Sequence, residues 1–182
     1  QEMLGDGRYN IDQILSAISF LKDKVSSSYS LENMMDALSN SIGSECGSWS
    51  AKDWAKDKEV LIVGSGPSVG KYINEIEQYI ETNNPIVLCL NINQDFPERL
   101  VDAYITCHET RITIELDLYT DLTKPIILPM SRIPRKISGI LSNVEILDYG
   151  LKIEKGSFSV QDNGCILDKP LVLIYALIIS II

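Results

Sequence analysis

Short apolar runs alternate with longer amphipathic stretches from residue 58 to about residue 150. Five of these runs have the length and β-branched content of strands, and they are Val60–Val63, Ile86–Leu90, Ala103–Cys107, Ile126–Leu128 and Glu145–Leu147. Helical patterns lie between them, at residues 69–82, 95–101, 109–119 and 133–141. Alternation at this spacing predicts parallel strands joined by right-handed crossovers. We therefore expect an α/β fold, a doubly wound parallel sheet with helices on both faces and a ligand at its carboxyl edge.

Two amphipathic helices are predicted ahead of the sheet. Their apolar positions share one face at helical spacing, and they are Ile11, Ile14, Leu15, Ile18, Leu21 and Val25, then Leu31, Met34, Met35, Leu38 and Ile42. A Gly/Ser-rich break at 43–52 follows, and we expect Trp49 and Trp54 to fix this linker onto the next domain. The predicted organisation is a helical segment and linker at 1–50 and an α/β domain at 51–182.

The last thirty residues depart from the strand–helix rhythm. Residues 152–168 predict a loop or a hairpin over the carboxyl edge of the sheet. The apolar stretch LVLIYALIISII is too short to cross a bilayer core of about 30 Å as a helix. We expect it to be a buried core helix in a domain cut short at its C-terminus, with no membrane as partner.

Composition narrows the class of partner. A formal charge of −9 argues against a nucleic-acid surface, which needs a basic stripe. The four cysteines form no CxxC pair, which favours a reducing, cytoplasmic setting without disulfides. One histidine in the chain nearly excludes a His-based metal site, and no metal site is predicted.

The first predicted strand runs into a glycine turn, which consists of Gly64, Ser65, Gly66, Pro67 and Ser68. A helix beginning here, capped by Ser68, would offer free N–H groups to a phosphate. The dinucleotide fingerprint GxGxxG fails because position 69 is Val, and the Walker pattern fails because Gly70–Lys71 comes one residue late. A phosphate-bearing ligand and an empty, purely structural turn both remain open.

Polar residues also follow the next strands. Asn91 and Asn93 follow the second strand and would read a ribose or base edge, or else form a turn. His108 follows the third strand, where it would serve as a general acid or base or as a structural hydrogen-bonding group.

Basic residues near the later strand ends suggest an anion clamp. Arg111 follows His108 in TCHETR, and Ser131 and Arg132 follow the fourth strand. Arg135 and Lys136 fit a solvated helix face better.

Several segments in order carry a resemblance: LIVGSGPSVGKYINEIEQYI, LNINQ, TCHETR, ILPMSR and EILDYGLKIE. Across about residues 50–182 they resemble the C-terminal Rossmann-like domain of bacterial HMG-CoA-lyase/4-hydroxy-2-oxovalerate aldolase-like proteins. The resemblance implies a preceding TIM barrel. The segment MLGDGRYNIDQI would belong to the helical stretch that connects this barrel to the α/β domain. The family's divalent metal and catalytic residues belong to that barrel and have no counterpart here, so this chain would not be catalytic alone.

Two more distant likenesses concern the glycine turn. Strand–GxGPS–helix followed by a strand-end Asn is similar to sialyltransferases that hold CMP-sialic acid, which implies nucleotide contacts at Gly64–Ser68 and Asn93. This chain has Ser65 where that family has Asn. Archaeal 6-hydroxymethylpterin diphosphokinases share a similar turn, but their acidic metal-binding residues have no clear equivalents here.

Three functions remain open at this point. The leading one is a nucleotide- or nucleotide-sugar-binding domain of an aldolase-type lyase. An independent glycosyl- or diphospho-transferase with His108 as its acid or base is the second. The third is a structural domain that supports homo-oligomerisation.

Overall fold

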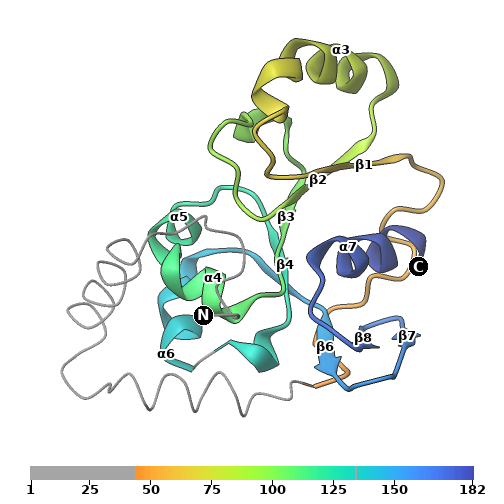
Figure 1. Ribbon diagram of the computed structural model, residues 1–182, viewed down its shortest axis with the longest axis vertical. Coiled ribbons are helices and arrows are strands. Elements are labelled where there is room, and N and C mark those ends of the chain that lie inside the picture. The colour runs from red at the N-terminus through yellow and green to blue at the C-terminus, as the bar shows by residue number, and fades with distance from the viewer. Residues whose placement is uncertain (1–43, 134) are drawn as a thin grey trace.

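A five-stranded parallel sheet forms the centre of the molecule (Figure 1). The computed structural model describes residues 44–133 and 135–182, so the amphipathic stretches at 11–25 and 31–42 lie outside the described residues. The strands are β1 (Val60–Val63), β2 (Ile86–Leu90), β3 (Ala103–Ile105), β4 (Ile126–Leu128) and β5 (Ile146–Asp148). The α/β, Rossmann-like fold class expected from the sequence is confirmed.

The strands are ordered β1-β2-β3-β4-β5, so each pairs with the next one along the chain. Right-handed crossovers that always advance in one direction place all their connecting elements on one face of the sheet. The order does not reverse among the described strands, unlike that of the expected doubly wound sheet. The connecting elements are η2 (Val69–Tyr72), α3 (Ile73–Asn83), η3 (Glu98–Leu100), α4 (Glu109–Ile114), α5 (Leu116–Thr120), η4 (Met130–Arg132), α6 (Arg135–Ile140) and η5 (Leu141–Asn143).

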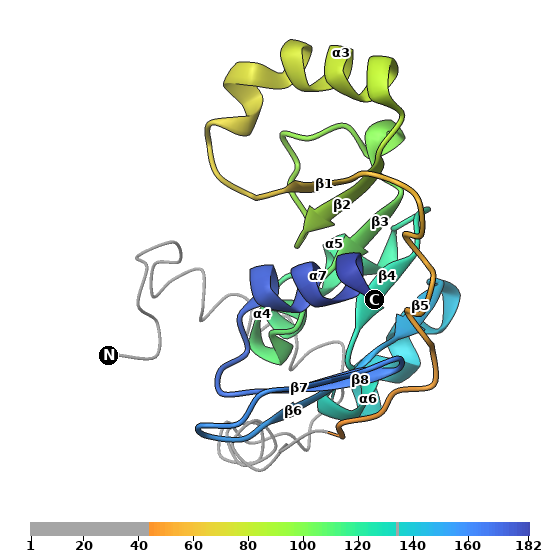
Figure 2. The same cartoon turned by 90° about the vertical axis from the view of Figure 1, so that its right-hand side faces the viewer.

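Two cores follow from this arrangement because successive strand residues face opposite sides of a sheet. Val87 and Cys89 of β2 join the core beneath the crossover helices, together with Ile112 of α4. Leu88 and Leu90 face the other side, where helix α7 (Val172–Ile181) covers them. Helices therefore lie on both faces, and among the described helices α7 is the one that covers the second face (Figure 2).

A second, three-stranded sheet packs on the α7 side. Its strands are β6 (Gly150–Ile153), β7 (Ser159–Gln161) and β8 (Gly164–Leu167), in the order β6-β8-β7. Strands β7 and β8 form an antiparallel hairpin, which is one of the two forms expected of residues 152–168. Leu151 and Cys165 of this sheet share the core of α7.

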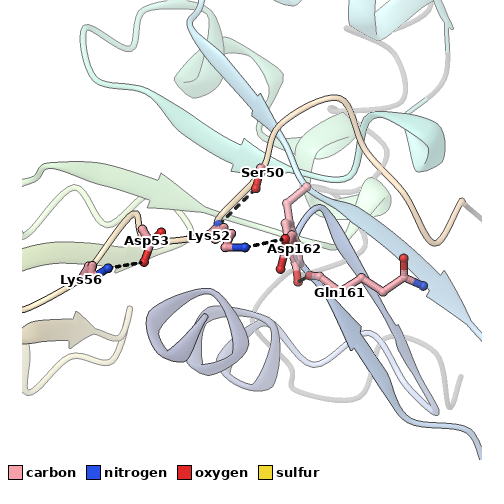
Figure 3. Close-up of polar contacts among 7 residues, drawn as sticks. Ser50, Lys52, Asp53, Lys56, Gln161 and Asp162 are labelled. Atoms are coloured by element: carbon pink, nitrogen blue, oxygen red, sulfur yellow. Dashed lines mark hydrogen bonds and ion pairs between the residues drawn. The ribbon is translucent and has the colours of Figure 1, made fainter.

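Residues 44–51 belong to the folded domain. Gly47 donates its N–H to the Asn163 carbonyl at 2.8 Å, and Trp49 donates to Asp148 at 2.9 Å beside β5. Trp49 and Trp54 pack on the α7 core, as expected. Figure 3 shows Lys52 directed at Asp162, with its Nζ 3.7 Å from the carboxylate. The packed domain thus extends to at least Ser44.

Helix α7 is buried on one face only. Tyr175, Ala176, Ile178 and Ile179 lie against the sheet, whereas Leu173, Leu177 and Ile181 are 49%, 43% and 79% exposed. The expected buried core helix is therefore confirmed for the inner face of α7, whereas its outer face is exposed. In the part of the chain that the structure describes, no helix has both the length and the apolar character needed to cross a membrane.

Candidate functional site

The glycine turn follows β1 at the carboxyl edge of the sheet. Val69 donates its N–H to the Gly66 carbonyl at 3.2 Å, and Lys71 donates to the Ser68 carbonyl at 3.1 Å. These bonds form the 3₁₀ turn η2, and α3 begins only at Ile73. The Ser68 side chain makes no capping hydrogen bond, so the expectation that Ser68 caps the helix is wrong.

The two glycines of this turn lie under open space. A Cβ added to Gly64 would meet no atom within 4 Å, and one added to Gly66 would meet only the Ser68 Oγ at 3.8 Å. Neither glycine has a positive φ. Neither backbone conformation nor internal packing therefore requires glycine here, and another molecule has room to approach the backbone closely.

Amide groups of the turn point to the chemistry of such a molecule. Among the described residues, no hydrogen-bond acceptor meets the backbone N–H groups of Ser65, Gly66 or Ser68. Successive unpaired N–H groups in a turn form a concave site for anions, and the N-terminal end of the following helical segment adds a partial positive charge. The turn is thus suited to a phosphate.

Asn93 supports the turn from the end of β2. Its side-chain Nδ2 lies 3.5 Å from the Gly64 carbonyl, and its Oδ1 accepts a hydrogen bond from the Asp95 N–H at 3.0 Å. Both ends of this buried amide are therefore engaged within the protein. Asn93 positions the turn, and the expected contact with a nucleoside would have to compete with these bonds.

Asn91 occupies a left-handed conformation, with φ 58°, at the end of β2. Asparagine tolerates this region better than most residues. Its buried side-chain Oδ1 accepts a hydrogen bond from the Thr106 hydroxyl at 2.9 Å. Thr106 therefore joins the ends of β2 and β3. The sequence did not reveal this role, although Thr106 stands two residues before His108 in a strand-end run.

His108 lies at the end of β3 as the N-cap residue of α4. It is half-buried, and burial lowers the pKa of its imidazole; the charge of Glu109 opposes this shift, while those of Arg132 and Arg111 add to it. The imidazole is therefore neutral near pH 7, the form that can accept a proton.

The arginines expected to form an anion clamp are paired with glutamates. Arg132 Nη2 lies 2.7 Å from Glu109 Oε1, and both side chains are buried. Arg111 Nε lies 2.8 Å from Glu115 Oε2 within its own helical segment. Each of these two arginines is thus balanced by a carboxylate, so the backbone of the glycine turn is the better candidate for an anion site.

Ser131 has a structural contact. Its Oγ accepts a hydrogen bond from the Ser44 N–H at 2.8 Å, which attaches the start of residues 44–51 to η4. The side chains of Arg135 and Lys136 lie outside the described part of the chain.

The predicted site residues therefore fall into two sets. The first set, Gly64–Ser68 with Asn91 and Asn93, belongs to the ends of β1 and β2. The second, with His108, Arg111 and Arg132, belongs to the ends of β3 and β4. Strands β1 and β4 are three strand spacings apart, about 14 Å. A single phosphate cannot contact both sets, whereas an extended ligand lying along the edge can.

Three of the four cysteines lie in the core of the domain, and Cys46 is exposed. Burial raises the pKa of Cys89 to about 11 and those of Cys107 and Cys165 to about 12. These thiols stay protonated and act as small apolar groups. No cluster of metal-ligating side chains occurs within residues 44–133 and 135–182.

Comparisons of the chain with models of protein families, with curated proteins and with solved structures found no match.

Proposed function

We propose that this domain binds a nucleotide or nucleotide-sugar, with a phosphate on the glycine turn. The observation that carries the proposal is the combination of open space over Gly64 and Gly66 with unpaired N–H groups at Ser65, Gly66 and Ser68. In a chain of charge −9, an anion needs a local site of this kind.

The extent of the carboxyl edge supports a ligand larger than phosphate. His108 lies about two strand spacings, roughly 10 Å, from the end of β1. A nucleoside or sugar attached to the bound phosphate would extend along the edge toward Asn91 and His108. The balanced ion pairs beyond them favour an uncharged ligand portion at that end.

The context that we propose for the domain is an aldolase-type lyase. The support is the series of segments from LIVGSGPS to EILDYGLKIE that resembles the accessory domain of such proteins. In this proposal the domain binds ligand, and lyase chemistry belongs to the barrel that the resemblance implies.

Thermal unfolding with CMP, CDP, UDP, GDP and ATP tests the binding proposal. A ligand present at about 100 times its dissociation constant stabilises a protein by about 2.7 kcal/mol, or about 5–10 °C for a domain of this size. We expect at least one nucleotide to produce such a shift, and calorimetric titration to confirm one site.

Two glycine variants make the test specific. Gly66→Leu places a side chain over the turn and should abolish the shift. Gly139→Leu is the matched control, because Gly139 also has open space around it but lies in α6. A shift that survives Gly66→Leu would place the ligand elsewhere, and no shift with any nucleotide at millimolar concentration would overturn the proposal.

A further inference from the structure

The two edges of the main sheet differ in how they are protected. At β5, residues 44–51 run alongside the edge strand and bond to Asp148 through the N–H groups of Ser48 and Trp49. At β1, no described strand pairs with the outer edge. Natural sheets usually block such an edge with lysine, proline or a bulge, but Val60–Val63 contains neither residue and pairs regularly with β2.

The backbone of β1 offers a defined set of hydrogen-bonding groups. The Glu59 carbonyl accepts the N–H of Ile86, so it points toward β2. Because alternate residues of a strand direct their peptide groups to opposite sides, Val60 and Ile62 direct theirs to the open edge. Two N–H groups and two carbonyls are therefore available to another extended strand.

We propose that the open edge of β1 pairs with β1 of a second copy of this chain. A two-fold axis through Leu61 places Val60 of one copy opposite Ile62 of the other, in antiparallel pairing. Each of these two residue pairs exchanges two hydrogen bonds, so all four free groups on each copy are used. The opposed side chains are then apolar on both faces of the joined sheet.

Charge restricts where a second copy could pair with this chain. Two chains of charge −9 repel each other, so they associate best through an uncharged surface. Strand β1 carries no charge, and the register centred on Leu61 places Glu59 opposite Val63 of the other copy rather than opposite a second Glu59. Helix α7 packs beside β1 over β2, and the stretch Leu171–Ile182 is also uncharged.

Partial burial gives this pairing a hydrophobic contribution. Val60 and Ile62 pack against the α7 core but remain half-exposed, and Leu61 remains half-exposed on the opposite face. Pairing with the same strand of another copy would remove more of these side chains from water. The four-residue strand makes a small interface, so we expect reversible dimerisation of modest affinity.

Sedimentation equilibrium at concentrations from about 1 to 200 µM tests the proposal, because modest affinities fall in this range. We expect the weight-average mass to rise from that of one chain toward twice that value. Hydrogen exchange at the two ends of this range should show the amides of Val60 and Ile62 becoming protected at high concentration. A mass of one chain throughout, or a dimer without this protection, would overturn the proposal.

Val60→Lys introduces a charge at the edge and should weaken dimerisation about tenfold or more. Phe158→Lys adds the same charge at an exposed apolar residue just before β7 and should leave dimerisation unchanged. Equal effects of the two variants would also overturn the proposal. Circular dichroism verifies that each variant folds. If Val60→Lys fails to fold, the hydrogen-exchange measurement on the unaltered chain still tests the proposal.

Discussion

At the scale of single residues, several polar groups at the carboxyl edge have partners inside the protein. Asn93 donates to the Gly64 carbonyl of the glycine turn, Arg132 pairs with Glu109, and the Ser131 hydroxyl accepts a hydrogen bond from the N–H of Ser44. A buried ion pair is costly to break, because the remaining charge would be left without compensation. These residues therefore shape the edge, while His108 keeps a half-buried imidazole beside them.

The imidazole of His108 gives folding stability a specific pH dependence. Burial lowers its pKa below the ordinary value of 6.5, so between these two values the unfolded chain binds more protons than the folded one. Its effect on stability is absent above about pH 7 and becomes destabilising as the pH falls below about 6.5. We expect His108→Gln to lose less stability than the unaltered chain between pH 7.5 and 5.5.

Urea denaturation of both proteins at several pH values measures this difference. Titrating carboxylates affect both proteins alike, so the difference between their free energies of unfolding isolates His108. Parallel pH profiles would contradict the prediction.

At the scale of elements, close glycine contacts join residues 44–51 to both sheets. A Cβ on Gly164 of β8 would lie 1.8 Å from the Glu45 carbonyl oxygen, and one on Gly47 would lie 2.0 Å from that of Asp148. These clashes involve backbone atoms, which cannot rotate away. The glycines allow residues 44–51 to lie directly on the strands.

Gly164→Ala should therefore destabilise the fold by about 1–3 kcal/mol, the usual range for overpacking. Gly139→Ala in α6 is the control, and it should be neutral or stabilising by about 1 kcal/mol, since alanine favours a helix. Urea denaturation compares them. Equal free energies of unfolding for the two variants would contradict the prediction, because they would show that residues 44–51 can move away from an added methyl group without loss of stability.

The sequence predicted elements better than their arrangement. Val60–Val63, Ile86–Leu90 and Ile126–Leu128 have the predicted bounds, because apolar β-branched runs mark buried strands locally. The strand order could not be read in this way, since such runs do not specify which neighbours pair. The site shows the same limit: its strand-end positions were visible, but the partners of Asn91, Ser131 and Arg132 come from other segments.

At the scale of the whole molecule, burial is uneven across the sheet. Strands β2, β3 and β4 are buried at every position, whereas α3, the helix between β1 and β2, has no buried residue. The inner side chains of α3 are only partly covered, and Tyr79 ties this helix to Glu59. Regions with few buried apolar contacts open at lower free energy than the core.

Hydrogen exchange should therefore be faster in α3 than in β2, β3 and β4. The proposed dimer does not alter this comparison, because it uses the edge and not the helix. Mass spectrometry of peptides from 73–83 and from 86–90 can measure it at low protein concentration. Equal protection of the two peptides would mean that α3 opens only when the whole domain unfolds.

The sequential strand order also affects how the chain folds as it is made. Each strand of the main sheet can pair with the one synthesised just before it, so the sheet can grow without waiting for distant segments. Residues 44–51 are made before all five of these strands but bond to Asp148, Asp162 and Asn163, about a hundred residues later. The earliest described part of the chain is thus among the last to be fixed, and its attachment closes the domain.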